Sequence, residues 1–153
     1  MCETAGSYVE IKTEDDIEYL QQSFGYFHDS VITNACFKTG NHVCDKYIMS
    51  FGNESDYKVH LFLSRQGEPR NIELIFAGVK RLNLAGYQNY YTVDISGCLF
   101  KLCTDLIAGR DDPLILWSVG DFSNNNEPES AKRILLKHTD SYVIASSLRY
   151  RIY

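Results

Sequence analysis

Residues 57–84 read YKVHLFLSRQGEPRNIELIFAGVKRLNL, and this stretch decides the fold. Apolar and polar residues alternate in its first part, and a second alternating run follows a turn that contains Gly67 and Pro69. Successive side chains of a strand point to opposite faces of a sheet, so each run is typical of a strand with one buried face. Two such runs around a turn of this composition predict a β-hairpin. Gly78, inside the continuation of the second run, suggests a bulge or a close approach by another strand.

The rest of the chain contains more strand-like runs. We expect strands over 31–38, 47–51, 79–84, 90–102, 114–119 and 142–153. Ser130 to Lys137 fits either a short helix or an eighth strand. No alternation of strands with helices is visible, which disfavours a parallel sheet. The sequence therefore predicts a mainly β protein, an antiparallel sandwich or partly closed barrel of about seven or eight strands with one N-terminal helix.

The predicted helix begins after Thr13. A hydroxyl at that position caps a helix, and the three acids that follow suit the positive end of its dipole. Ile17, Leu20 and Phe24 recur at helical spacing, and Gly25 ends the segment. We expect residues 1–12 to be a loose N-terminal segment and 13–153 to be a single β-rich domain.

Three apolar residues on the predicted strands are candidates for the core. Trp117 lies in a largely apolar run, and Phe76 and Leu148 lie on alternating faces of two others. We expect all three side chains to be buried.

Composition limits the classes of function. The chain has 153 residues, with 44% hydrophobic and 23% charged, which is ordinary for a globular protein. Its formal net charge is −5, whereas nucleic-acid binders concentrate Lys and Arg. No run approaches the roughly 18 apolar residues of a membrane span. We therefore expect neither nucleic acid nor membrane as a partner.

The cysteines indicate a reducing compartment. An odd number of cysteines without an export signal favours free thiols in the cytoplasm, and their spacing contains no CxxC pair for zinc. Structural thiols are therefore favoured over metal ligands, and we expect no metal and no cofactor. The five positions are Cys2, Cys36, Cys44, Cys98 and Cys103.

Charged residues offer few catalytic candidates. His28 next to Asp29 is the sharpest local pair, although neighbouring residues rarely assemble a catalytic dyad and a turn is the favoured interpretation. Glu73 is expected at the surface. If the sheet curls, however, Glu73 would point inward with Arg149 or Arg151, and a buried pair of that kind marks a site.

A tyrosine-rich segment is the best candidate for a contact surface. Tyr87, Tyr90 and Tyr91 stand among Gly, Gln and Asn, a composition that resembles protein interfaces. Ordinary packing at a strand edge explains them equally well.

Four short motifs, in order, support a family resemblance. They are Phe27-His28-Asp29-Ser30, the run from Ile72 to Leu84, Ile115-Leu116-Trp117, and the run from Val143 to Arg151. In these the chain resembles a group of small bacterial β-rich proteins with an FHDS-type start, some of which are similar to immunity proteins encoded beside polymorphic toxins. The group has no assigned reaction, so the resemblance carries over no catalytic residue. Its immunity-like members are the part of the resemblance that implies contact with a toxin.

Three classes of function remain open. The first is a non-enzymatic binding protein of the immunity type, whose acidic charge suits a basic partner protein. The second is a small-molecule-binding barrel, or an enzyme with a site in the barrel mouth. The third is a structural or self-associating domain. The absence of metal-ligand spacing, nucleophile motif and phosphate loop favours binding over catalysis.

Overall fold

The computed structural model describes residues 6–86, 94–119 and 141–153. Its helices are α1 (Glu14–Ser23) and two 3-10 turns, η1 (Gly25–Phe27) and η2 (Glu54–Asp56). Its strands are β1 (Val9–Ile11), β2 (Ser30–Lys38), β3 (His42–Val43), β4 (Met49–Ser50), β5 (Lys58–Arg65), β6 (Asn71–Asn83), β7 (Cys98–Cys103), β8 (Leu114–Val119) and β9 (Ser141–Ile152).

Seven strands form one antiparallel sheet in the order β2-β5-β6-β9-β8-β7, and β1 pairs with β9 beside this path. β3 and β4 form a separate two-stranded sheet. The predicted fold class is confirmed: the described residues form a mainly antiparallel β structure with one α-helix, and their sheet does not close into a barrel.

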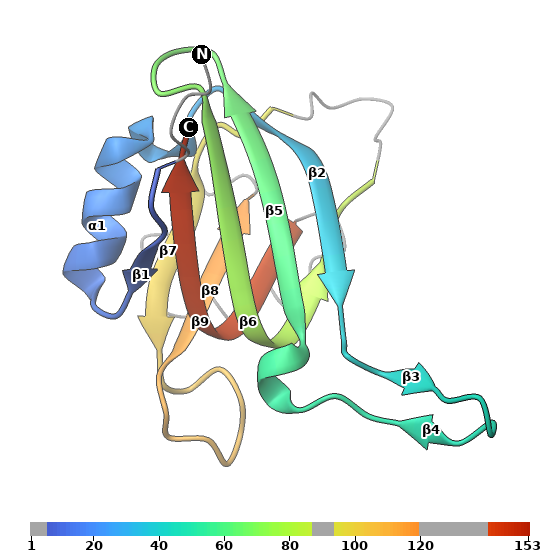
Figure 1. The fold of residues 1–153 in the computed structure, drawn as a ribbon. Coiled ribbons are helices and arrows are strands. Elements are labelled where there is room, and N and C mark those ends of the chain that lie inside the picture. Colours follow the sequence, from blue (N-terminus) through green and yellow to red (C-terminus); the bar gives the residue numbers. More distant parts are fainter. Residues whose placement is uncertain (1–5, 87–93, 120–140) are drawn as a thin grey trace.

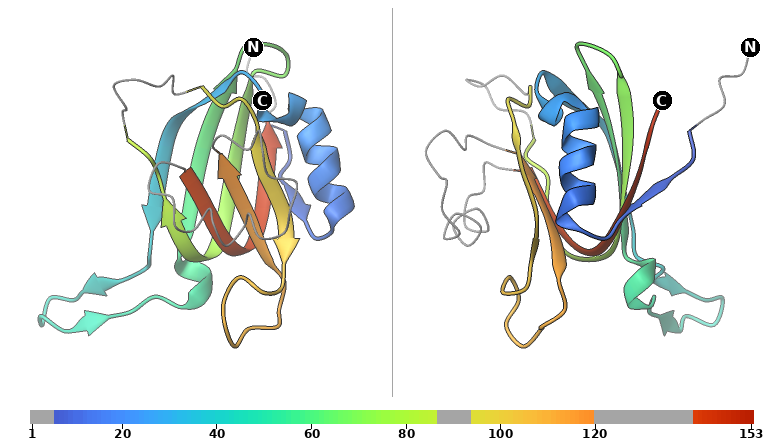
Figure 2. Two further views of the ribbon diagram at one scale, coloured as in Figure 1. Left: turned by 180° about the vertical axis from the view of Figure 1, so that it is seen from behind. Right: turned by 90° about the vertical axis from the view of Figure 1, so that its left-hand side faces the viewer.

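The sheet curves around the helix. β6 and β9 are long and bend, so that β2 and β5 lie on one side of α1 and β7 and β8 lie on the other (Figures 1 and 2). The apolar face of α1 packs into this hollow: Ile17, Leu20 and Phe24 belong to the same buried cluster as side chains from both sides of the sheet. The hollow is therefore filled by the protein's own side chains.

The helix starts where the sequence predicts. Thr13 Oγ1 accepts the backbone N–H of Asp16 at 3.2 Å, and the Asp16 carboxylate accepts the Thr13 N–H at 2.9 Å, which completes a capping box. The helix ends before Gly25, which has a positive φ of 57°. An added Cβ at Gly25 would meet the guanidinium of Arg65, and the positive φ is strained for other residues, so both features favour glycine here.

The predicted core residues are buried as expected. Trp117, Phe76 and Leu148 all belong to the main cluster. The Trp117 ring lies 6.2 Å from Phe76 and 6.3 Å from Phe27 between ring centroids, so aromatic contacts join the sheet to the turn after α1. The predicted bulge is also confirmed, because the register of β6 on β9 shifts between Val79 and Arg81, just after Gly78.

Other expectations need correction. The segment 1–12 is not loose over Val9–Ile11, which form β1 along β9; three residues are too short to show a period. The strand expected over 47–51 is only Met49–Ser50, since nothing but β3 pairs with it among the described residues. Among the described residues of the strand expected over 90–102, only β7 and a single bridge from Ile95 to Ser30 form sheet pairs. The alternatives for 130–137 lie outside the described residues. No helix in the described part of the chain is long and apolar enough to cross a membrane.

Candidate functional site

A polar cluster lies on the outer face of the sheet, which we define as the face of β5, β6 and β9 turned away from α1. The register places His60 of β5 opposite Ile75 of β6, and Ile75 in turn opposite Arg149 of β9. It also places Glu73 of β6 opposite Arg151 of β9. Tyr8, just before β1, joins them. The members of this outer-face cluster are Tyr8, His60, Glu73, Arg149 and Arg151.

Glu73 is the centre of the cluster and is only 3% exposed. Its Oε2 accepts hydrogen bonds from the Tyr8 hydroxyl and from Arg151 Nε, both at 2.7 Å. Its Oε1 lies 3.1 Å from His60 Nδ1. Both carboxylate oxygens are therefore occupied by donors from three different strand regions.

The electrostatics favour the ionised carboxylate. Burial alone would raise the pKa of Glu73, but the hydrogen bonds from Tyr8, His60 and Arg151 outweigh it and leave that pKa below its ordinary value. Burial and the adjacent carboxylate raise the pKa of Tyr8. Donors from three separate parts of the chain hold this carboxylate in its ionised form, so the cluster ties the segment before β1 to the sheet.

This arrangement corrects one expectation and supports another. Glu73 is buried and not at the surface, because Tyr8 covers it. Its ionic partner is Arg151, one of the two arginines considered from the sequence. The pair lies on the outer face of the sheet and does not point inward as the sequence analysis considered. Arg149 does not reach Glu73; it lies 4.9 Å from the centre of the Tyr8 ring, and Arg151 lies 5.0 Å from it. Sequence analysis missed Tyr8 because it lies 65 residues from Glu73.

His28 and Asp29 lie elsewhere, in the turn between η1 and β2. His28 Nδ1 is 2.9 Å from Asp29 Oδ2, and both side chains are largely exposed. The Asp29 carbonyl accepts the backbone N–H of Gln66 at 3.0 Å, which ties the turn to the β5–β6 loop. The interpretation of this pair as turn structure fits these contacts, and the structure does not bring it to Glu73.

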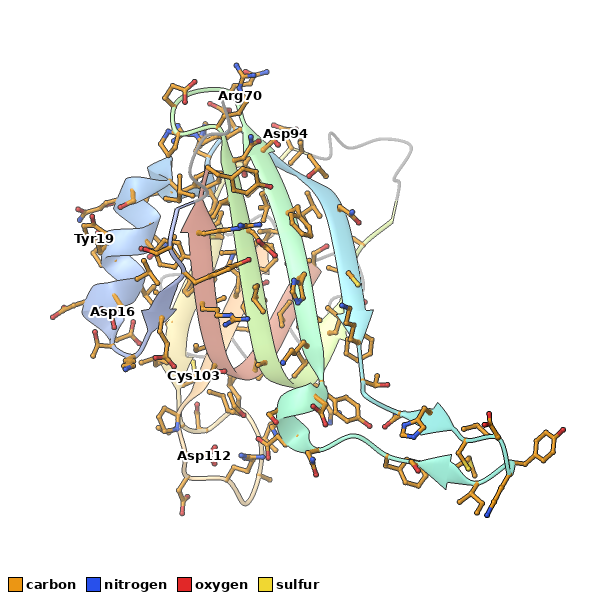
Figure 3. The ribbon with its side chains drawn as sticks, viewed as in Figure 1. Asp16, Tyr19, Arg70, Asp94, Cys103 and Asp112 are labelled. Atoms are coloured by element: carbon orange, nitrogen blue, oxygen red, sulfur yellow. The ribbon has the colours of Figure 1, made fainter. Side chains whose placement is uncertain are left out.

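A cavity of about 510 Å³ opens beside this turn. Figure 3 shows two of its residues, Arg70 and Asp94, at the same end of the molecule. The guanidinium of Arg65 lies 5.6 Å from the Phe24 ring centre, between the cavity and the core. The lining residues are Asp29, Val31, Ser64, Arg65, Gln66, Arg70 and Asp94.

The remaining candidates bring no chemistry together in the described residues. Tyr87, Tyr90 and Tyr91 lie outside these residues. No group of three His, Cys, Asp or Glu side chains that could hold a metal occurs in the part that the structure describes. Cys36, Cys44, Cys98 and Cys103 are free thiols, and Cys36 is exposed on β2.

The most prominent surface feature is the segment from Thr39 to Asn53, which we call the arm. It contains β3 and β4 and projects away from the rest of the sheet (Figures 1 and 2). Large apolar side chains along it are exposed instead of packed, and Phe37 at the end of β2 continues the same surface. These exposed residues are Phe37, Val43, Tyr47, Ile48, Met49 and Phe51.

The base of the arm is fixed by specific contacts. Asn41 Oδ1 accepts the backbone N–H of Gly52 at 2.8 Å and joins the two sides of the arm. Asn41 Nδ2 also donates to the Tyr57 hydroxyl at 3.0 Å, which connects the arm to the start of β5. An added Cβ at Gly52 would come within 2.1 Å of the Thr39 carbonyl oxygen. The arm thus leaves the sheet in a defined direction.

The exposed side of α1 is a second distinctive surface. The helix contains four acids and no basic residue. Tyr19, 67% exposed, points away from the sheet beside them (Figure 3), and Tyr26 donates its hydroxyl to Glu18 at 2.9 Å. The face combines negative charge with aromatic contact area.

Comparisons with protein-family models, with curated proteins and with solved structures give no match for this chain.

Proposed function

We propose that this chain is a non-enzymatic binding protein that acts by contact with another protein, and that the arm is its main contact element. The observation that carries the proposal is the set of exposed apolar side chains on the arm. Contiguous exposed apolar surface marks interaction sites in soluble proteins, because water contact with such surface is unfavourable. The contacts of Asn41 support the proposal further, since an arm held in place loses little conformational entropy on binding.

The outer-face cluster supports binding over catalysis. Glu73 is the most buried acid among the described residues, and its oxygens are already satisfied by Tyr8, His60 and Arg151. Hydrogen bonds from three protein donors satisfy a buried carboxylate without any ligand, which is what a structural acid requires.

If the partner is a protein other than a second copy of this chain, we propose that the chain has an immunity-type role. The net charge of −5 and the acids of α1 suit a basic toxin, because complementary fields speed encounter and disfavour wrong partners. A toxin gene directly upstream, whose product is neutralised by co-expression of this chain, would support this role.

The proposal is tested by affinity capture from cells that naturally carry the gene. Three forms of the full chain serve as bait: wild type, the arm variant Tyr47→Ser/Phe51→Ser, and Tyr19→Ser. The Tyr19→Ser variant is the control, because it makes the same Tyr-to-Ser change at a tyrosine outside the arm. We expect a protein that wild type and Tyr19→Ser retain and the arm variant loses. Equal retention by all three would contradict the role of the arm, and loss with Tyr19→Ser alone would move the contact to α1.

A second candidate function, small-molecule binding, rests on the cavity beside Asp29. Its volume of about 510 Å³ lies in the range of ligand pockets, and Arg65 and Arg70 offer donors for an anionic group. A panel of small carboxylates and phosphates would be tested by thermal shift on wild type and Arg65→Ala. A ligand that stabilises only wild type would favour this candidate.

A further inference from the structure

We propose that the arm binds the arm of a second copy of this chain and that the protein is a symmetric homodimer. This inference rests on the proposed function, because it names the partner of the same surface. The inference excludes an arm that binds only a different protein, because the free chain would then be a monomer.

The first argument is the amount of apolar surface that the arm exposes. The exposed fraction ranges from 51% to 91% among the five large apolar side chains of the arm and the adjoining Phe37 of β2. With typical side-chain areas these residues expose roughly 600 Å², at the upper end of what one patch on a monomer shows. Two arms packed together would bury about 1,200 Å², the lower bound of a specific, stable interface.

The second argument is charge. The chain carries −5 overall, so two copies repel each other over most of their surfaces. The arm contains only Asp45 and Lys46 as charged residues, one of each sign. It is therefore neutral, and it projects away from the acidic helix and the body of the sheet (Figure 1).

The third argument is self-complementarity. In a two-fold symmetric interface the same patch meets itself, and any charge must face an opposite charge from the other copy. Because Asp45 and Lys46 are neighbours, a two-fold axis near the tip lets Asp45 of each copy approach Lys46 of the other. The apolar residues on both sides of the tip then form the buried centre, as in other interfaces with an aromatic core.

The experiment measures the mass of the full chain by sedimentation velocity at about 1–100 μM, for wild type, Tyr47→Ser/Phe51→Ser and Tyr19→Ser. We expect wild type and Tyr19→Ser to sediment at twice the monomer mass of 17.5 kDa. The arm variant should be a monomer, with a dimer Kd raised by about 100-fold or more, since each lost ring counts twice in a symmetric contact. Circular dichroism and Tm verify that all three fold alike.

A second measurement uses the native thiol of Cys44, which is exposed in the arm. Its rate of maleimide labelling should fall as the concentration of wild type rises and should stay constant in the arm variant. A rate independent of concentration in wild type would overturn the inference even if the arm variant folded poorly.

The outcomes separate this inference from the proposed function. If wild type is still a monomer at about 100 μM, a concentration at which even a weak dimer forms, the homodimer is overturned. The capture experiment then decides whether the arm binds a different protein. A dimer that persists in the arm variant overturns it too, because another surface then mediates association. Capture that is independent of the arm together with a monomeric wild type would refute both.

Discussion

The Tyr8 hydroxyl donates a hydrogen bond of 2.7 Å to the carboxylate of Glu73, 65 residues further along the chain. The ring of Tyr8 lies against the guanidinium groups of Arg149 and Arg151, so one side chain covers the buried acid and both arginines of β9. Through this contact the N-terminal strand β1 is held to the centre of the sheet.

Replacement of Glu73 by Gln should therefore destabilise the fold. The amide cannot accept all three donors, and its NH₂ group must face at least one of them. We expect a loss of about 2–4 kcal/mol in the free energy of unfolding, measured by urea denaturation. Tyr8→Phe keeps the ring and loses one hydrogen bond, so it should cost only about 1 kcal/mol. Equal stability of Glu73→Gln and wild type would show that the carboxylate is not held as described.

The same carboxylate predicts a dependence on pH. The pKa of Glu73 is lower in the folded state than its ordinary value of 4.5, so the unfolded state binds more protons between these two values. Stability from this group is present above pH 4.5 and is lost as the pH falls through the folded pKa. The difference in Tm between wild type and Glu73→Gln should therefore shrink from pH 6 towards pH 3. Both proteins contain the other acids with lowered pKa values, so the effects of those acids cancel in the Tm difference. A Tm difference that stays constant with pH would contradict the prediction.

The core makes a prediction of its own. Phe76 is fully buried against Trp117, and Phe76→Ala leaves a cavity between sheet and helix. We expect a loss of about 3–5 kcal/mol, measured by chemical denaturation. Tyr19→Ala removes a similar volume from the exposed side of α1 and serves as the control, with a change within about 0.5 kcal/mol. A loss below about 1 kcal/mol for Phe76→Ala would mean that the core closes around the gap.

The thiols should differ widely in reactivity. Burial raises the pKa of Cys98 to about 12, whereas backbone hydrogen bonds from Ile48 and Lys46 lower the pKa of Cys44. Because the thiolate is the reactive form, Cys44 should be labelled at pH 8 on the order of 10³ times faster than Cys98 in a dilute, folded sample. Peptide mapping by mass spectrometry measures both rates. Comparable rates in the folded protein, or labelling of Cys98 first, would refute the burial of Cys98.

The hairpin, the helix cap and the core could be predicted because each depends on neighbouring residues. Alternation over 57–64 places Val59, Leu61 and Leu63 inward, and they are buried. The capping residue Thr13 acts within one helical turn. Local patterns of this kind are readable without the fold.

The outer-face cluster and the arm could not be predicted, for different physical reasons. Tyr8 meets Glu73 only after β9 brings β1 and β6 together, and no local pattern encodes that contact. The run 47–51 has the composition of a half-buried strand, but it projects from the sheet where no described element can cover it. The pairing of Glu73 with Arg151 was considered from the sequence. Which face of the sheet carries the pair could not be predicted, because that depends on the direction in which the sheet curves.

The position of β9 in the sheet has a consequence for synthesis. This strand pairs with β6, β8 and β1, yet it follows all of them in the sequence. A nascent chain can close the β5–β6 hairpin early, but the other edge of β6 has no neighbour until residues 141–152 leave the ribosome. Sheets that depend on such distant pairing fold slowly, and an open apolar strand edge invites aggregation. For this protein the hazardous interval therefore runs from the completion of β6 at Asn83 to the completion of the central strand β9 at Ile152.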